Sequence, residues 1–289
     1  MDERDRRIGE AEALATGRAF TVTSHLQVVE VRGDDAPTWL HDLLTADIVS
    51  LVPGTACRSL LLTPTGRIRA DLTVGRVQAG FALLQERDIG DDIAAALRPY
   101  VLSARVELRP STHVVITTCA EPATRSSSVD VAPSHLGVGR DLLPDDLAEA
   151  GAALTAEGAV KVDLERLDDL RVRLGCPRIG VDFEPGALPA EAGLDSTIDV
   201  DKGCFLGQES VAKVRRLGHP PSVVRHVRAD HELVAGDQVR AEDVQVGRVT
   251  SAAPSPAGWF ALVRVPWAAA ASQLRASDGR VLLDVPTRG

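Results

Sequence analysis

Segments that alternate apolar and polar residues are interleaved along this chain with segments whose apolar residues recur at helical spacing. Residues 20–31 and 60–77 show the period of a strand, because successive side chains of a strand point to opposite faces. Helical spacing follows at residues 34–44, 91–102 and 163–174, where apolar side chains fall about one turn apart. The interleaving predicts a fold that contains both sheets and helices.

Proline and glycine mark the ends of these segments. Pro99 is expected to end or kink the second helix, since proline lacks the amide hydrogen that a helix interior requires. The stretch 121–144 is rich in Pro, Ser and Gly, so the sequence predicts a long loop there. Pro220 and Pro221 form a further break, and residues 223–285 then consist of short Val-rich runs separated by turns.

The chain length agrees with more than one packed unit. Its 289 residues exceed the roughly 100 to 200 residues of a typical domain. We therefore expect a larger region at residues 1–221 and a β-rich C-terminal domain at residues 222–289.

Composition and charge exclude several classes of protein. The net charge of −9 repels polyanions, and aromatic residues make up only 3% of the chain, too few for the stacking platforms of single-strand binders. We therefore expect no bulk nucleic-acid binding. No apolar run approaches the roughly 20 residues of a membrane-spanning helix, and residues 1–10 alternate charges. The sequence predicts a cytoplasmic protein with no membrane partner.

The cysteines and histidines form no metal-ligand pattern. Cys57, Cys119, Cys176 and Cys204 stand far apart, without the paired spacing of a zinc or iron–sulfur site. No stable metal is expected, and a cytosolic setting keeps such thiols reduced. A P-loop, a dinucleotide fingerprint and a nucleophile elbow are all missing from the sequence, which excludes the usual NTPase, Rossmann and hydrolase interpretations.

The most unusual segment is residues 201–209, in which Gly203 and Gly207 lie on either side of Cys204. Glycines so close together permit backbone angles that other residues avoid, and they let another group approach closely. Lys202 precedes the cysteine, and a helix is expected to begin just after the second glycine. A helix start and nearby cations favour the thiolate, so Cys204 is a candidate reactive thiol. The alternative is a small buried thiol in a tight turn.

A family resemblance rests on this segment. It resembles the signature motif of YgfZ-type folate-binding proteins through Lys202, Gly203, Cys204, Phe205, Leu206, Gly207, Gln208 and Glu209. Residues 40–48, 61–74 and 97–108 resemble the N-terminal blocks of the same family, in the same order. Residues 170–182 and 188–191 are similar both to YgfZ-type proteins and to the glycine-cleavage T-protein, an aminomethyltransferase. The resemblance covers most of the chain.

The resemblance implies an α+β fold of the aminomethyltransferase-like, folate-binding kind. In that fold, intertwined α+β domains surround a central hole, and a C-terminal β-barrel closes one side. It also implies tetrahydrofolate, or a one-carbon derivative of it, as the cofactor. Family members take part in the assembly or repair of iron–sulfur clusters, so the resemblance implies iron–sulfur client proteins as partners and Cys204 as the functional thiol.

Asp71 is the second candidate catalytic residue. By resemblance it matches the catalytic aspartate of the T-protein, on a strand that follows the turn at Gly66. A carboxylate beside a folate amine can accept its hydrogen bond or its proton. The alternative is a strand-end aspartate in water.

Three further residues are candidate cofactor contacts. Arg171 matches an arginine of the T-protein and, with Lys202, is a candidate partner for the negatively charged tail of folate. An arginine on a helix is otherwise commonly solvated. Glu191 is a candidate for orienting the loop that leads to the signature motif, and a solvated surface acid is the alternative.

Three functions follow from these candidates. The leading hypothesis is a tetrahydrofolate-binding accessory protein for iron–sulfur proteins that uses Cys204. The second is a folate-dependent one-carbon transferase that uses Asp71. The T-protein segment that grips the pterin has no recognisable counterpart between Val114 and Arg166, which argues against this second hypothesis. The third is a folate-independent scaffold.

Overall fold

The structure is a computed structural model that describes residues 2–87, 92–112, 114–119, 129–132 and 134–286. The chain forms two compact units, and neither is contiguous in sequence. The unit that we call the two-sheet unit consists of Glu12–Leu164 and Thr197–Gln208. The other, the barrel unit, consists of Met1–Ala11, Glu165–Ser196 and Glu209–Gly289.

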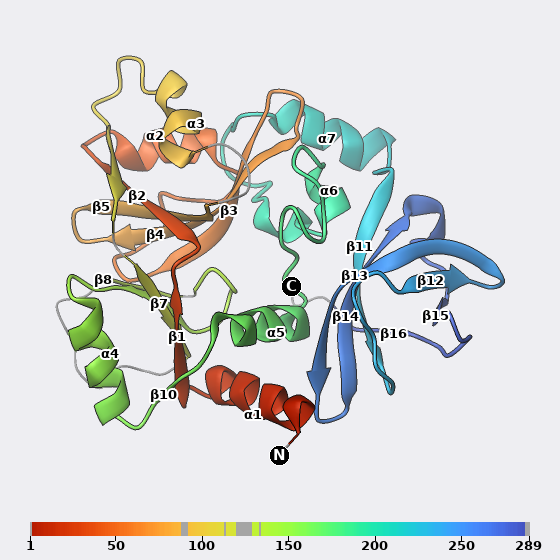
Figure 1. Ribbon diagram of the computed structural model, residues 1–289. Helices are drawn as coiled ribbons and strands as arrows, with labels where there is room; N and C mark the ends of the chain where they lie inside the picture. Colours follow the sequence, from red (N-terminus) through yellow and green to blue (C-terminus); the bar gives the residue numbers. More distant parts are fainter. Residues whose placement is uncertain (1, 88–91, 113, 120–128, 133, 287–289) are drawn as a thin grey trace. The chain divides into compact units, whose positions relative to one another are not determined.

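Two five-stranded sheets form the two-sheet unit (Figure 1). The first sheet has the order β3-β4-β5-β2-β6, with antiparallel neighbours. The second has the order β10-β1-β7-β9-β8, in which β1 and β10 run parallel. The strands are β1 (Ala19–Thr23), β2 (Leu26–Arg32), β3 (Ala56–Leu62), β4 (Ile68–Val77), β5 (Gly80–Glu86), β6 (Glu107–Ser111), β7 (Val115–Thr118), β8 (Val129–Val131), β9 (Arg140–Leu143) and β10 (Val160–Lys161).

Buried apolar clusters define the layers of this unit. Helices α2 (Ala36–Leu43) and α3 (Ile93–Leu97) share a core with one face of the first sheet. Helix α4 (Leu147–Ala156) packs against the second sheet. A third cluster, which includes Leu84 and Val115, joins the two sheets. The order of layers is therefore helix, sheet, sheet, helix.

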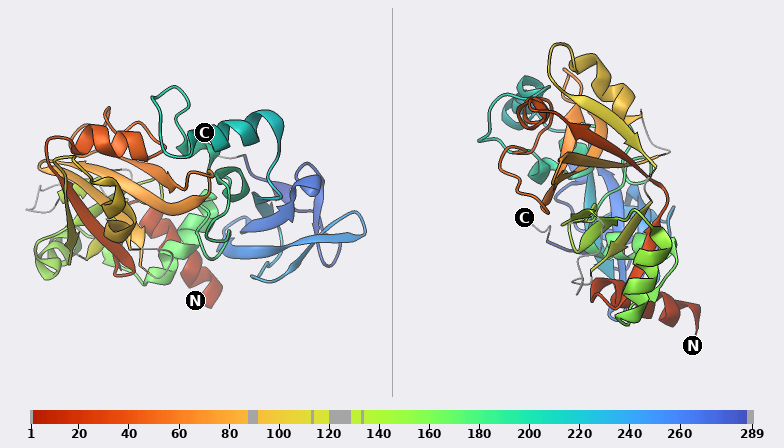
Figure 2. Two further views of the ribbon diagram at one scale, coloured as in Figure 1. Left: turned by 90° about the horizontal axis from the view of Figure 1, so that it is seen from above. Right: turned by 90° about the vertical axis from the view of Figure 1, so that its left-hand side faces the viewer.

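A curled six-stranded sheet dominates the barrel unit, coloured from cyan to dark blue in Figure 1 and Figure 2. Its order is β15-β12-β13-β14-β11-β16, and its concave core contains Val227, Val239 and Val263. The strands are β11 (Ser222–Ala229), β12 (Gln238–Ala241), β13 (Val244–Ser255), β14 (Gly258–Pro266), β15 (Leu274–Ala276) and β16 (Leu283–Asp284). The sheet is a half-barrel, and the α+β fold class is confirmed.

Helices complete both units. The remaining α-helices are α1 (Glu3–Ala15), α5 (Leu164–Leu174), α6 (Pro189–Ala192) and α7 (Gln208–Leu217). Short 3-10 turns occur at η1 (Arg98–Tyr100), η2 (Asp195–Thr197) and η3 (Trp267–Ala269). Within the described residues, no helix is long and apolar enough to cross a bilayer.

Most of the predicted elements are present, with two corrections. The helix predicted at 91–102 is shorter, because α3 ends at Leu97 and the chain continues as the 3-10 turn that contains Pro99. The long loop predicted at 121–144 is wrong for residues 129–131 and 140–143, which pair with each other as β8 and β9. Residues 121–128 and 133 of that stretch lie outside the described part of the chain.

The boundary predicted near residue 222 coincides with the start of β11. The compact unit around this sheet also includes α6 and nearly all of α5 and α7. Independent folding of residues 222–289 therefore stays a prediction.

Candidate functional site

Strand alternation places Asp71 on the face of the first sheet that points away from α2 and α3. Its neighbours Ala70 and Leu72 belong to the core shared with those helices, and successive side chains of a strand point to opposite faces. Asp71 therefore faces the second sheet. It lies inside β4, and its side chain is 11% exposed, which contradicts the alternative of a strand-end aspartate in water.

Arg58 on β3 holds both carboxylate oxygens of Asp71. Its Nε donates to Oδ1 at 2.9 Å and its Nη2 donates to Oδ2 at 2.5 Å, the two-pronged geometry in which arginine binds carboxylates most strongly. Each carboxylate oxygen has a second lone pair. The Arg58–Asp71 pair therefore still offers acceptor capacity to a ligand.

A tight turn at residues 134–139 positions His135. Within it, the Ser134 amide donates to the Gly139 carbonyl and the Gly137 amide donates to the Ser134 carbonyl. Gly139 has a φ of +64°, and a Cβ there would lie 2.5 Å from the Thr118 carbonyl oxygen. Only glycine tolerates that combination of backbone angle and close approach, so the path of this turn is closely constrained.

Asp141 on β9 fixes the imidazole of His135. The neighbouring Leu142 packs toward α4, so the alternation of the strand points Asp141 toward the first sheet. The carboxylate is fully buried. It accepts hydrogen bonds from the His135 amide at 2.8 Å, from His135 Nδ1 at 2.9 Å and from Thr117 Oγ1 at 2.6 Å. A buried carboxylate requires such a set of donors.

The charge of Asp141 alters the titration of His135. Burial by itself lowers the pKa of this histidine, but the carboxylate of Asp141 and its hydrogen bond outweigh burial and raise the pKa above its usual value. Glu86 adds to the increase, and Arg58 opposes it. These effects show that residues from β3, β5 and β9 act on one imidazole between the two sheets.

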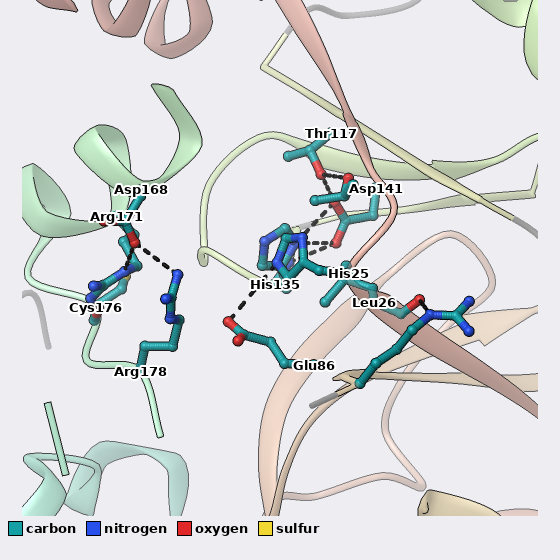
Figure 3. A network of polar contacts seen from close by, with 12 residues as sticks. His25, Leu26, Glu86, Thr117, His135, Asp141, Asp168, Arg171, Cys176 and Arg178 are labelled. Carbon is teal, nitrogen blue, oxygen red and sulfur yellow. Dashed lines mark hydrogen bonds and ion pairs between the residues drawn. The ribbon is translucent and has the colours of Figure 1, made fainter. Parts of the chain in front are cut away.

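His25 and Glu86 complete this group of side chains. The ring of His25 meets the ring of His135 edge to face, with centroids 6.4 Å apart. Its Nε2 lies 4.0 Å from Glu86 Oε1. Figure 3 shows the two imidazoles between the carboxylates of Asp141 and Glu86. We call the set His25, Arg58, Asp71, Glu86, His135 and Asp141 the inter-sheet polar layer.

Lys202 clamps the signature segment onto the two-sheet unit. Its Nζ donates to the backbone carbonyls of His41, Leu44 at 2.6 Å and Ala46 at 2.9 Å. These contacts use all three donors of a lysine ammonium. Burial lowers the pKa of Lys202 to about 8. The contacts give Lys202 a structural role, and its assignment to folate binding stays a prediction.

The clamp leaves Cys204 in solvent. Cys204 is exposed, which contradicts the alternative of a buried thiol. Gly207, three residues after Cys204, has a φ of +83°, and a Cβ there would lie 2.5 Å from the Thr63 carbonyl oxygen in the turn between β3 and β4. Leu206 packs against the core beside α2 and α3. The segment therefore lies on the helical side of the first sheet, whereas Asp71 points to the opposite face.

Cys57 is the contrasting thiol of the same unit. Burial raises its pKa to about 12, and the charge of Asp47 adds to the increase. Because the thiolate is the nucleophile, Cys57 is unreactive at neutral pH. The exposed Cys204 is the better candidate for thiol chemistry in this unit.

Arg171 lies in the barrel unit and is buried among acids. Its Nη1 donates to Asp182 at 2.6 Å, its Nε to Asp168 at 2.6 Å and its Nη2 to the hydroxyl of Ser251 at 2.7 Å; Figure 3 shows part of this set. The side chain is 5% exposed, so it is not a solvated helix arginine. These contacts tie α5 to β13, and a role in folate binding stays a prediction.

Glu191 is buried as well. Its Oε1 accepts a hydrogen bond from the Leu188 amide at 3.0 Å at the start of α6, and Ser222 donates to its other oxygen at 3.4 Å. The alternative of a solvated surface acid is therefore contradicted. Glu191 orders the start of α6, and its role in orienting the loop that leads to the signature stays a prediction.

The structure divides the predicted site residues into three groups. Asp71 lies in the inter-sheet polar layer, Cys204 and Lys202 lie on the helical side of the first sheet, and Arg171 and Glu191 belong to the barrel unit. The sequence carries no motif that points to Arg58, the partner of Asp71, or to Glu86. Asp141, which falls in the predicted loop, was also missed. The alternation of side chains along a strand is the sequence signal that could have shown which of these residues share a face of a sheet.

No group of three or more His, Cys, Asp or Glu side chains in the described ranges has the geometry to hold a metal ion.

Comparison with known proteins finds a family model that matches part of this chain and a solved structure with the same fold. Residues 4–118 match the model of the GCVT N-terminal domain. The fold is aminomethyltransferase-like: the crystal structure of the glycine cleavage system aminomethyltransferase T from Bartonella henselae superposes with a TM-score of 0.76, over 96% of this chain and 88% of that one, at 21% identity.

Three sequence relatives each match more than four fifths of this chain. An uncharacterized protein of Haemophilus influenzae is 26% identical, over 81% of this chain and 84% of its own length. The aminomethyltransferase of Nitrosococcus oceani is 24% identical, over 90% and 79%. A chloroplastic protein of Arabidopsis thaliana, provisionally named a transferase, is 24% identical over 83% of this chain. The match spans 63% of that plant protein.

Proposed function

We propose that this protein binds tetrahydrofolate in the cytoplasm and serves as an accessory protein in the assembly or repair of iron–sulfur clusters, with Cys204 as its functional thiol. One observation carries the proposal. In an aminomethyltransferase-like fold, the segment that resembles the YgfZ-type signature holds Cys204 in solvent through the Lys202 clamp and the close approach of Gly207.

The inter-sheet polar layer supports the folate part of the proposal. A pterin ring presents amino and N–H donors together with carbonyl and ring-nitrogen acceptors. Asp71, held by Arg58, and Glu86 supply carboxylate acceptors. The acceptors of the layer therefore fit the amino and N–H donors of such a heterocycle. Folate would supply a one-carbon carrier, and these residues would bind and orient it.

The chemistry of a single thiol limits what Cys204 does for a client protein. Iron–sulfur clusters are held by several cysteine thiolates, so one exposed thiol per chain contacts a cluster only transiently. It can also attack a disulfide or another electrophile, since an accessible thiolate is a nucleophile. Both roles require the exposure that the structure gives Cys204.

A one-carbon transferase is the second candidate function, supported by the relatives named aminomethyltransferase. In it, Asp71 accepts the hydrogen bond or the proton of a folate amine while the methylene unit of an aminomethyl donor passes to tetrahydrofolate, and the donor's amine leaves as ammonia and its carrier leaves protonated. Arg58 donates hydrogen bonds to both carboxylate oxygens of Asp71. This pairing argues against Asp71 as a base that is freely available to a substrate. Formation of 5,10-methylenetetrahydrofolate from an aminomethyl donor would establish this function.

Calorimetric titration with tetrahydrofolate under anaerobic conditions tests the proposal first. We expect the wild type to bind, Asp71→Asn to bind more weakly, and Cys204→Ser to bind like the wild type. A wild type that does not bind tetrahydrofolate contradicts the proposal and favours the folate-independent scaffold.

Complementation of cells that lack the protein tests the thiol. Cells that carry the Cys204→Ser variant are expected to lose the activity of their iron–sulfur enzymes. Cells that carry the matched control, Cys119→Ser, are expected to retain it. Full complementation by Cys204→Ser would show that the thiol is dispensable and would overturn its functional role.

A further inference from the structure

The His135–Asp141 pair has the geometry of an oriented acid–base group. Asp141 accepts from Nδ1 of His135 at 2.9 Å, which fixes Nδ1 as the nitrogen that carries hydrogen in the neutral ring. The other ring nitrogen, Nε2, then has a free lone pair and points away from Asp141. The side chain of His135 is 14% exposed, so it is sheltered but still within reach of a ligand.

The charges around His135 favour proton uptake rather than anion binding. Asp141 and Glu86 are acids, His25 is titratable, and Arg58 is engaged by Asp71. With Arg58 and Asp71 cancelling each other, the rest of the inter-sheet polar layer is negative until an imidazole is protonated. Such a group attracts a proton or a cationic amine and repels a second anion.

The Thr117 hydroxyl holds the carboxylate from the other side. It donates to Asp141 Oδ1 at 2.6 Å and lies 2.8 Å from the hydroxyl of Thr23, and both threonines are buried. The carboxylate therefore stays in place while the imidazole changes its charge. This second set of contacts keeps the His135 ring oriented in both protonation states.

We propose that His135 is an acid–base residue of the inter-sheet polar layer, oriented by the positioning residue Asp141, and that it exchanges a proton through Nε2 with a titratable nitrogen of the bound heterocycle. The inference rests on the proposed folate binding and names a residue that does the proton transfer.

The proton balance is simple. On binding, one proton enters from the solvent, and the ligand nitrogen passes it to the Nε2 lone pair of neutral His135. The ligand becomes neutral, and the imidazole becomes an imidazolium that keeps its Nδ1–H bond to Asp141. The histidine and the aspartate together change from a net charge of −1 to 0, which burial favours. The reverse step returns the proton.

Calorimetry in two buffers of different ionisation enthalpy measures the protons exchanged when tetrahydrofolate binds. We expect the wild type to exchange a fraction of a proton near neutral pH and His135→Gln to lose that exchange. Glutamine keeps an N–H donor for Asp141, so the turn is preserved. His219→Gln is the control, because His219 lies exposed in the barrel unit, and it is expected to behave like the wild type.

Nitrogen-detected NMR of the histidine rings tests whether Asp141 orients and charges His135 as the geometry indicates. His135 is expected to show the neutral tautomer with hydrogen on Nδ1 and a pKa above the ordinary value of 6.5, and Asp141→Asn is expected to lower that pKa.

These experiments distinguish a failure of the proposed role of His135 from a failure of the proposed folate binding. Equal proton exchange in the wild type and His135→Gln overturns the role of His135 but leaves folate binding intact. A His135 ring with the opposite tautomer also overturns it. A wild type that does not bind tetrahydrofolate overturns the proposed function and this proton transfer together, even if the NMR titration follows expectation.

Discussion

Two cysteines of the two-sheet unit differ sharply in their expected reactivity. A thiol whose pKa is about 12 has about one thiolate in ten thousand at pH 8. Cys57 should therefore react with a thiol reagent only after unfolding, whereas the exposed Cys204 should react in the native state. We predict one fast-reacting thiol at pH 8, measured by absorbance with a disulfide reagent.

The matched variants identify that thiol. Cys204→Ser is expected to lose the fast phase, and Cys176→Ser is expected to keep it. A fast phase that survives in Cys204→Ser would mean that another cysteine is the accessible one.

Arg171 illustrates a predicted binding residue whose contacts are those of a structural ion pair. Its partner Asp182 is fully buried, so removing the guanidinium leaves an uncompensated charge. We predict that Arg171→Ala lowers the free energy of unfolding of the barrel unit by about 3–5 kcal/mol, measured by urea denaturation. Arg216→Ala, at an exposed position of α7, is the control. An unchanged midpoint for Arg171→Ala would restore the interpretation of Arg171 as a ligand contact.

His135 should make stability depend on pH. Its pKa in the folded state is raised above the ordinary value of 6.5 by Asp141, so the folded protein binds a proton more tightly than the unfolded chain. The stabilisation is fully present below pH 6.5 and is lost as the pH rises through the folded pKa. We predict that His135→Gln removes this loss, measured by denaturant unfolding at several pH values. An identical pH dependence in both proteins would contradict the interaction.

At the scale of elements, the signature segment depends on two glycines with different roles. Gly207 has a positive φ, and a Cβ there would lie against the Thr63 carbonyl, whereas a Cβ at Gly203 would meet nothing within 4 Å. We predict that Gly207→Ala lowers the free energy of unfolding by at least about 1–2 kcal/mol, and that Gly203→Ala changes it by less than about 0.5 kcal/mol.

Urea denaturation of the two glycine variants checks this difference. Because the substitutions are chemically identical and lie four residues apart in one segment, the comparison isolates the backbone requirement. Equal effects would mean that the close approach at Gly207 does not constrain the segment.

Elements with a strong local signal were predicted well. The helix expected at 163–174 is α5, and the helix expected after the second glycine is α7. Strand β9 was missed, because its residues lie in a stretch rich in Pro, Ser and Gly, and its pairing with β7 and β8 supplies the order that local propensity does not.

At the scale of the whole molecule, the chain leaves and re-enters its compact units. Residues 197–208 return to the two-sheet unit between two segments of the barrel unit, so the signature motif belongs to a unit whose other residues come from earlier in the chain. A linear division at residue 222 does not describe that path.

The fragment 222–289 is predicted to be less stable than the longer fragment 165–289. The longer fragment keeps the hydrogen bonds that Arg171 and Arg173 of α5 make to Ser251 and to the Pro254 carbonyl. It also retains Asp182, which accepts from the hydroxyls of β13. We expect a higher urea midpoint for 165–289, monitored by tryptophan fluorescence. Equal midpoints would support residues 222–289 as an independent domain.

The sequence by itself determined the mixture of strands and helices, the β-rich C-terminal part and the segment around Cys204. Each of these depends on residues close together in the chain, through side-chain periodicity and turn chemistry. Only the tertiary structure decided which side chains meet. The pairing of Arg58 with Asp71 depends on strand register, and the partners of Lys202 are backbone carbonyls that no residue type reveals. The contact between Asp141 and His135, and the separation of Asp71 from Cys204 by a sheet, arise from the stacking of layers distant in sequence.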